Sequence, residues 1–171
     1  MGRDGEIRIA GATELLPGVA QPDLERRQAA LTKWIREVRG GVLSGAFFLE
    51  QNIDLTILQH TLGATADEER KTFFREHFLS RVSFDRRIQI VSAIVSDSSL
   101  AARLNKVRRI RNAMAHQPCW FELSDGANQS SLTTHILIDK VAVNVDDKVV
   151  EGWNELMAGL LRDTRPQDLT E

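Results

Sequence analysis

The stretch LAARLNKVRRIRNAMAH, residues 100–116, decides the fold because its apolar side chains recur at helical spacing. On a helical wheel of about 100° per residue, four of them lie within roughly 40° of one direction and form a core-facing stripe: Leu100, Leu104, Val107 and Met114. Arg111 falls about 20° from Leu100, inside that stripe. Burying its charge unpaired costs several kcal/mol, so Arg111 must meet a carboxylate, open into a cleft or face a partner subunit.

His116 ends the same stretch and lies about 140° from Arg111 on the wheel, so an ideal helix does not bring the two side chains together. Pro118 disfavours helical geometry at Gln117, which would let the last turn loosen and redirect the imidazole. A second copy of the chain, related by two-fold symmetry, is the other way to bring an arginine and a histidine into one site.

An arginine and a histidine without a strong nucleophile suit phosphoryl transfer in which an RNA 2′-hydroxyl attacks. The histidine would move a proton and the arginine would hold the developing phosphate charge, with no metal required. Lys106, Arg108 and Arg109 add a local positive patch for RNA phosphates. The structural alternative is a helix-end histidine at the surface, a solvated basic face, and an Arg111 that pairs with Glu50 or Asp54.

Length and composition indicate one domain without a bulk charge preference. The chain has 171 residues, a net charge of −2 and a pI near 6.1, so nucleic-acid binding would need a local patch. A single cysteine, Cys119, excludes an intramolecular disulfide and fits a reducing compartment. Polar residues interrupt the apolar segment 42–62, which predicts a buried helix rather than a membrane span. We expect a cytoplasmic protein.

The chain is divided by glycine, proline and capping signals into a leader over 1–21, a helical domain over 22–163 and a tail over 164–171. A first helix starts near Pro22 and is interrupted at Gly40–Gly41, and a second covers 42–62. Three further helices are predicted to start at a capping box over Thr65–Glu68, at an N-cap at Ser83 and at an N-cap at Ser98 or Ser99. After them the sequence predicts a polar loop over 124–131, a hairpin over about 132–145 and a last helix over about 147–162.

The segment IRNAMAHQP resembles the signature of the HEPN superfamily, an arginine followed four to six residues later by a histidine. GGVLSGAFFLEQNIDLTILQ resembles the first long helix of that superfamily, and SFDRRIQIVSAI with LNKVRRIRNAMAH resembles its paired later helices. The ending RNAMAH is also similar to proteins related to the mannitol operon repressor. The likeness covers about residues 24–120. It implies a mainly α fold, a four- to five-helix bundle, here with a short hairpin and a C-terminal helix.

By position, the resemblance makes Arg111 and His116 the catalytic pair and Asn112 the polar residue that supports them. It also implies a homodimer whose two motifs face one cleft and, for catalytic members, metal-independent ribonuclease activity in toxin–antitoxin or phage-defence systems with a cognate antitoxin. Toxins modified by a partner nucleotidyltransferase carry a tyrosine two residues after the histidine. Here Pro118 stands there and the chain has no tyrosine, so such an AMPylating partner is not expected.

Three functions remain after the sequence is considered. The first is a metal-independent endoribonuclease. The second is a catalytically silent HEPN module that binds a protein partner, and the third is a DNA-binding repressor, which lacks support from a recognition helix. His60, His77 and His135 lie far apart without a second ligand at metal spacing, so no metal or cofactor is expected.

Overall fold

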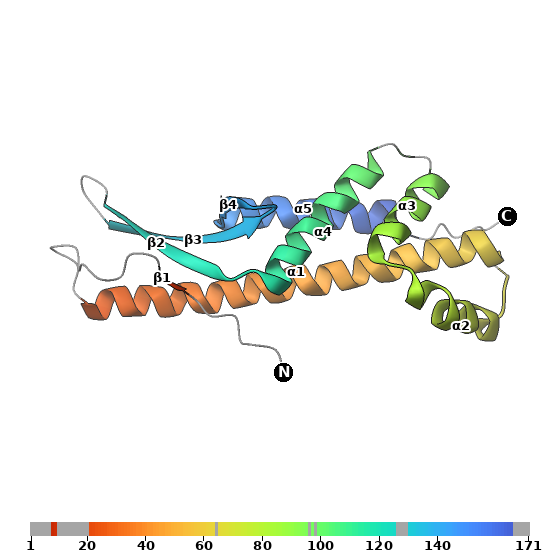
Figure 1. The fold of residues 1–171 in the computed structure, drawn as a ribbon, viewed down its shortest axis with the longest axis horizontal. Coiled ribbons are helices and arrows are strands. Elements are labelled where there is room, and N and C mark those ends of the chain that lie inside the picture. Colours follow the sequence, from red (N-terminus) through yellow and green to blue (C-terminus); the bar gives the residue numbers. More distant parts are fainter. Residues whose placement is uncertain are drawn as a thin grey trace. The chain divides into compact units, whose positions relative to one another are not determined.

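The computed structural model describes residues 8–9, 21–63, 65–95, 97, 99–125 and 130–165, and these residues form a mainly α fold, as predicted (Figure 1). Most of the predicted leader and of the predicted tail lies outside the described residues. The helices are α1 (Gln21–Leu62), α2 (Glu68–His77), the 3₁₀ turn η1 (Leu79–Arg81), α3 (Phe84–Val95), α4 (Leu100–His116) and α5 (Asp147–Asp163). The strands are β1 (Arg8–Ile9), β2 (Cys119–Asp125), β3 (Ser130–Ile138) and β4 (Val141–Asn144).

The chain divides into two compact units that share their three long helices. The first unit consists of Met1–Leu43 and Arg109–Trp153, and the second consists of Ser44–Arg108 and Asn154–Glu171. Helices α1, α4 and α5 each contribute one part to the first unit and the other part to the second.

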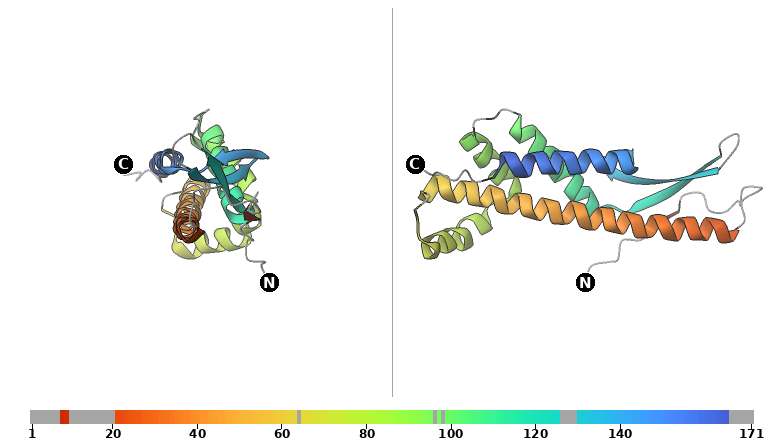
Figure 2. Two further views of the ribbon diagram at one scale, coloured as in Figure 1. Left: turned by 90° about the vertical axis from the view of Figure 1, so that its left-hand side faces the viewer. Right: turned by 180° about the vertical axis from the view of Figure 1, so that it is seen from behind.

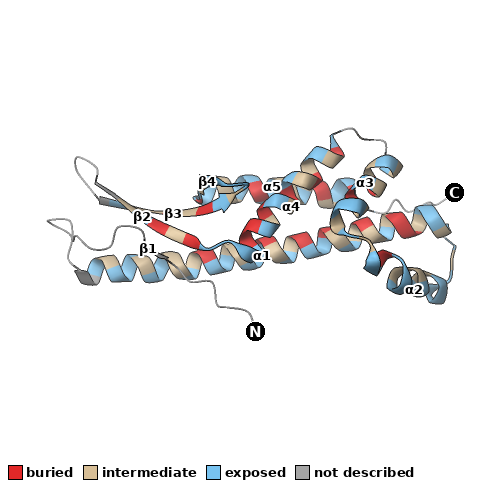
Figure 3. Cartoon of the chain, in the orientation of Figure 1, coloured by how far each residue is buried: buried red, intermediate tan, exposed pale blue. Residues whose placement is uncertain are grey.

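The second unit is built around an apolar core. Figure 3 shows buried residues recurring along one side of each long helix, which is the pattern of amphipathic packing. At full burial, each leucine or isoleucine contributes about 1.5–3 kcal/mol of transfer free energy. The buried members of this core come from α1, η1, α3, α4 and α5: Ala46, Leu49, Ile53, Ile57, Leu58, Leu79, Ile88, Val91, Leu100, Leu104, Val107 and Leu160.

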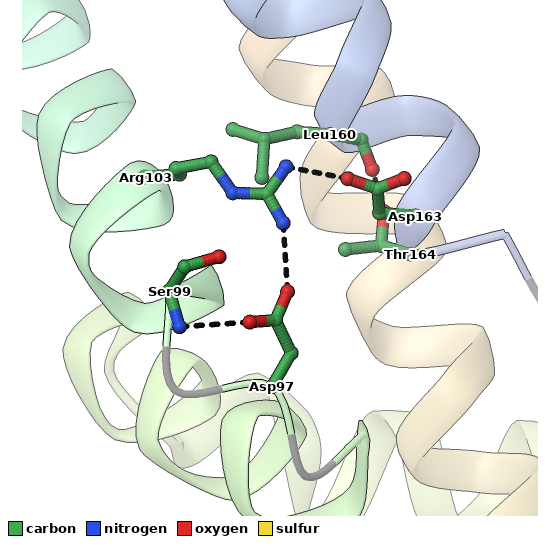
Figure 4. A network of polar contacts seen from close by, with 6 residues as sticks. All are labelled: Asp97, Ser99, Arg103, Leu160, Asp163 and Thr164. Carbon is green, nitrogen blue, oxygen red and sulfur yellow. Dashed lines mark hydrogen bonds and ion pairs between the residues drawn. The ribbon is translucent and has the colours of Figure 1, made fainter.

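A polar network in the same unit links the start of α4 to the end of α5 (Figure 4). Arg103 on α4 donates to Asp97 at 2.8 Å and to Asp163 on α5 at 2.5 Å. Asp97 also accepts a hydrogen bond of 2.7 Å from the Ser99 backbone N–H, just before α4. Hydrogen bonds from the Ser99 hydroxyl and backbone, with the charge of Arg103, lower the pKa of the Asp97 carboxyl.

The first unit contains the sheet, in the order β1-β2-β3-β4. β2, β3 and β4 pair antiparallel, whereas β1 pairs parallel with β2. Asp139 and Lys140 have positive φ values of 52° and 69°, which is the conformation of a two-residue type I′ hairpin turn. Figures 1 and 2 show the sheet alongside the N-terminal half of α1. The predicted hairpin is confirmed, but β1 and β2 were not predicted, and the end of β2 extends into the predicted loop.

The prediction that Gly40–Gly41 interrupts the first helix is wrong, because α1 is one helix of 42 residues. Both glycines are exposed, and a Cβ on either would meet nothing within 4 Å. Two exposed glycines cost about 1 kcal/mol each relative to alanine, which the packing on both sides of them offsets. Gly45 marks a close approach between helices, since a Cβ there would lie 3.1 Å from Met157 Cγ.

Two of the predicted helix starts differ in outcome. The N-cap of α2 is Asp67, whose side chain accepts a 2.7 Å hydrogen bond from the Arg70 N–H, so the capping box with Thr65 as N-cap is wrong. Ser83 precedes α3 as predicted and accepts from the Arg86 N–H at 3.3 Å. A carboxylate two residues closer to the helix displaces the hydroxyl of Thr65 because it also favours the positive end of the helix dipole.

The uninterrupted α1 predicts that Gly41→Ala raises the free energy of unfolding by about 0.5–1 kcal/mol, since alanine is preferred in an open helix interior. Gly45→Ala should stabilise less or destabilise, because its Cβ would press on Met157. Urea denaturation of the two variants measures the contrast. A loss of stability in Gly41→Ala would contradict a continuous helix at this position.

The network around Asp97 predicts that the stability of the protein depends on pH in the acidic range. Folding lowers the pKa of the Asp97 carboxyl below its ordinary value of 3.8. The contribution of Asp97 to the free energy of unfolding is therefore complete above pH 3.8 and disappears as the pH falls through the pKa of the folded state. The difference in urea midpoint between the wild type and Asp97→Asn should be constant from neutral pH to about pH 5 and shrink below about pH 4. Glu151→Gln, an exposed acid on α5, is the control that should show no such change. A difference unchanged down to pH 3 would exclude this role.

Candidate functional site

The candidate site is the C-terminal end of α4, and the helix there stays regular to His116. The Gln117 N–H still donates to the Ala113 carbonyl at 2.8 Å, so the predicted loosening of the last turn is not found. Pro118 ends the helix only after that bond is made. Asn112 and His116 are both exposed and lie one turn apart on the same side of α4.

Arg111 is half-buried, and among its contacts is a hydrogen bond of 3.0 Å from its Nη1 to Asn112 Oδ1. Asn112 therefore contacts the guanidinium of Arg111, and its role in supporting catalysis stays a prediction. Because α4 is regular, Arg111 and His116 point in directions about 140° apart. The structure does not bring the two predicted catalytic side chains together within one chain.

The acidic residues predicted to pair with Arg111 belong to the second unit, whereas Arg111 belongs to the first. Asp54 is engaged by Arg87, whose Nη1 donates to both carboxylate oxygens at 3.0 and 3.1 Å. Glu50 is half-buried on α1. Pairing of Arg111 with either acid stays a prediction.

Two of the three basic residues predicted to contact RNA phosphates are bound to carboxylates in the structure. Arg109 contacts Asp139 in the hairpin turn at 3.1 Å, within the first unit. Arg108 pairs with Asp85 at the start of α3, within the second unit. Lys106 is exposed. A phosphate would have to replace two carboxylates before it could use both guanidinium groups.

Arg39 on α1 holds the segment that follows the motif. Its Nη2 donates to the Gln117 carbonyl oxygen at 3.0 Å and lies 3.3 Å from Cys119 Sγ. Cys119 is buried at the start of β2, where its thiol packs in the interior of the first unit. The segment directly after His116 is thus held by a side chain that lies 78 residues before Gln117 in the chain.

A second cluster of polar and aromatic side chains was missed by the sequence analysis. His135 on β3 lies 3.3 Å from Glu122 on β2, contacts the Thr133 hydroxyl at 2.9 Å and stacks on Trp120 with ring centroids 5.6 Å apart. These residues alternate along paired strands and so share one face of the sheet. The pattern Trp-x-Glu over 120–122 was the available signal, but it is informative only once β2 is known to be a strand.

No group of three histidine, cysteine or acidic side chains in the described ranges is arranged to hold a metal ion. No helix in the same ranges has the length and apolar character that crossing a membrane requires.

Comparison with known proteins gives no relative: no family model, no curated protein and no solved structure matches this chain. The resemblance to the HEPN superfamily therefore rests on the motif and helix patterns of the sequence.

The Arg39 contacts predict the accessibility of the thiol. Arg39→Met should speed the labelling of Cys119 by a thiol reagent about tenfold or more, because two hydrogen bonds that close the segment 117–119 are lost. Arg36→Met, one turn earlier on α1 and exposed, is the matched control and should label at the wild-type rate. Equal rates in all three proteins would show that Arg39 does not hold this segment.

Proposed function

We propose that this chain is a metal-independent endoribonuclease of the HEPN type that acts in the cytoplasm as a homodimer, in a toxin–antitoxin or phage-defence role. The observation that carries the proposal is the exposed His116 at the end of α4, one turn after the Asn112 that binds Arg111. No hydrogen bond or ion pair joins the His116 side chain to another described residue. The imidazole is therefore available to a substrate.

The chemistry follows from these groups. The RNA 2′-oxygen forms a bond to the adjacent phosphorus, the bond from phosphorus to the 5′-oxygen breaks, and a 2′,3′-cyclic phosphate and a 5′-hydroxyl result. The His116 imidazole of the site accepts the 2′-hydroxyl proton and then, as the imidazolium, donates a proton to the leaving 5′-oxygen. Arg111 stabilises the additional negative charge on the phosphate oxygens.

A dimer supplies what one chain lacks. On a regular α4, Arg111 and His116 of the same chain diverge by about 140°, so a phosphate held by one cannot be reached by the other without a second copy. Two-fold symmetry provides two copies of each side chain and can place the arginine of one chain opposite the histidine of its partner. The proposed site therefore combines Arg111 and Asn112 of one protomer with His116 of the other.

The proposal predicts cleavage of single-stranded RNA in EDTA, with 2′,3′-cyclic phosphate ends, and loss of cleavage in both Arg111→Ala and His116→Ala. Mixing the two inactive proteins after subunit exchange should restore about a quarter of the wild-type activity, since half of the random dimers are mixed and each has one intact site of two. The assay measures 5′-labelled fragments by gel, and His60→Ala, an exposed histidine on α1, is the control.

Several outcomes would reject the proposal or part of it. Retention of cleavage in either single variant would exclude that side chain from catalysis. Absence of restored activity in an exchanged mixture would exclude a site shared between chains. Failure of an intact dimer to cleave any RNA in a mixed pool would favour the second function.

The second function is a catalytically silent module that binds a protein partner. The observation that favours it is the ion pairing of Arg108 with Asp85 and of Arg109 with Asp139, because paired guanidinium groups add little positive field for RNA. A purified dimer that neither cleaves nor binds RNA at low salt would support this function over the first.

A further inference from the structure

The exposed side of α1 changes from charged to uncharged along the helix. Between residues 23 and 37, seven of the nine exposed residues are charged. Over residues 44–55, which belong to the second unit, no exposed residue is charged. The exposed residues there are Ser44, Phe47, Phe48, Gln51 and Leu55, and each of the two phenylalanines is 57% exposed. A helix surface that faces water normally carries charged and polar residues, so an apolar one marks a surface that another molecule covers.

The other sides of this stretch are occupied by helices of the same unit. Asp54 accepts a 3.0 Å hydrogen bond from Arg87 on α3, and Asn52 donates to the Leu161 carbonyl on α5 at 3.2 Å. Leu49 is fully buried in the core of the unit. The exposed residues lie on the opposite side of α1 from its core residues, so the described helices of this unit leave them uncovered.

Four of the exposed residues have the spacing of a seam between two helices. Ser44, Phe48, Gln51 and Leu55 follow one another at steps of four, three and four residues, and they lie within about 60° of one another on a helical wheel. This is the repeat of the residues that face a second helix in a coiled coil. Phe47 lies beside this seam, with its ring centroid 5.9 Å from that of Phe48.

The seam is complementary to a second copy of itself when the two helices run antiparallel. With the two-fold axis midway between positions 49 and 50, Phe48 meets the partner's Gln51 and Leu55 meets the partner's Ser44. Each large apolar side chain then faces a smaller or more flexible one, and no like charges meet because the seam has none. In a parallel pair each residue would meet its own copy, which would place two serines in one layer and two phenylalanines in the next.

We propose that the seam of α1 is the surface through which two copies of this chain form an antiparallel homodimer. Phe47 and Phe48 of both copies would together remove on the order of 400–500 Å² of apolar surface from water, roughly a third of what a standard interface buries. This interface would form the homodimer that the proposed function requires. The inference rests on that function only for the need for a second copy, because the spacing and charge of the seam are independent of catalysis.

The oligomeric state of the whole chain tests the role of the seam. Sedimentation equilibrium of the wild type should show a dimer at micromolar concentration. Phe48→Glu should weaken dimerisation about a hundredfold or more, because it places a carboxylate next to its own copy at the two-fold axis. Phe73→Glu, the same change at a residue that is 56% exposed on α2, is the matched control and should dimerise as the wild type does. Circular dichroism checks that both variants keep their helices, as expected for exposed positions.

Cysteine crosslinking tests the antiparallel register. A chain with both Ser44→Cys and Leu55→Cys should form a disulfide-linked dimer on mild oxidation, because these two positions meet across the axis. Within one helix they are about 16 Å apart, too far for a disulfide inside the chain. Each single variant should stay unlinked, since its cysteine lies about 16 Å along the axis from that of its partner. The wild type, whose Cys119 is buried, is the control.

Three results would overturn the inference. The first is a wild type that is monomeric at about 100 µM, where a micromolar Kd would give a dimer. The second is a folded Phe48→Glu variant that dimerises as tightly as the wild type, which would place the interface elsewhere. The third is a crosslink between two copies of Ser44→Cys, which would exclude this register. A wild-type dimer that dissociates in Phe48→Glu yet cleaves no RNA would support the interface and reject the proposed function.

Discussion

Burial of the apolar stripe of α4 is the constraint on which the polar residues of this protein depend. Leu100, Leu104 and Val107 are buried in the second unit, and Ile110, Ala113 and Met114 are buried in the first. Truncating one buried leucine of this kind costs about 2–5 kcal/mol, so the rotation of the helix about its axis is strongly determined. That rotation also determines the directions of Arg103, Arg108, Arg111 and His116, which no surface contact worth about 1 kcal/mol can alter.

The burial of this stripe also explains why a run of basic residues in the sequence does not produce a basic surface. Arg103, Arg108 and Arg109 each find a carboxylate from another element, because a helix with this phase directs them to α5, α3 and the hairpin turn. These pairs differ in how easily RNA could replace them. Arg109 and Asp139 are both half-exposed, so exchange there costs little. Arg108 has a buried Nε without a partner, and its displacement would disturb packing as well as charge.

Local signals predicted the elements that depend on local chemistry. The end of α4 before Pro118, the Ser83 cap and the hairpin from β-branched residues all follow from backbone rules that act within a few residues. The interruption at Gly40–Gly41 failed because a helix packed on both sides of two exposed glycines tolerates their propensity cost. β2 was missed although Cys119, Phe121 and Leu123 alternate, because seven residues next to a helix end carry too little periodic signal.

The candidate site shows the same division between local and non-local information. The sequence identified Arg111 as an anomaly on an apolar stripe, and its hydrogen bond to Asn112 joins two neighbours in the chain. Whether His116 and Arg111 contact the same substrate depends on how two chains pair, and the spacing of residues within one chain does not predict that pairing. The seam of α1 is invisible to sequence reasoning for a related reason: residues 42–62 predicted a buried helix, and only the packing of the core against one side of α1 leaves Phe47 and Phe48 exposed on the other. Sites made by non-local packing therefore emerge from the fold, even where the residues that build them look unremarkable in the chain.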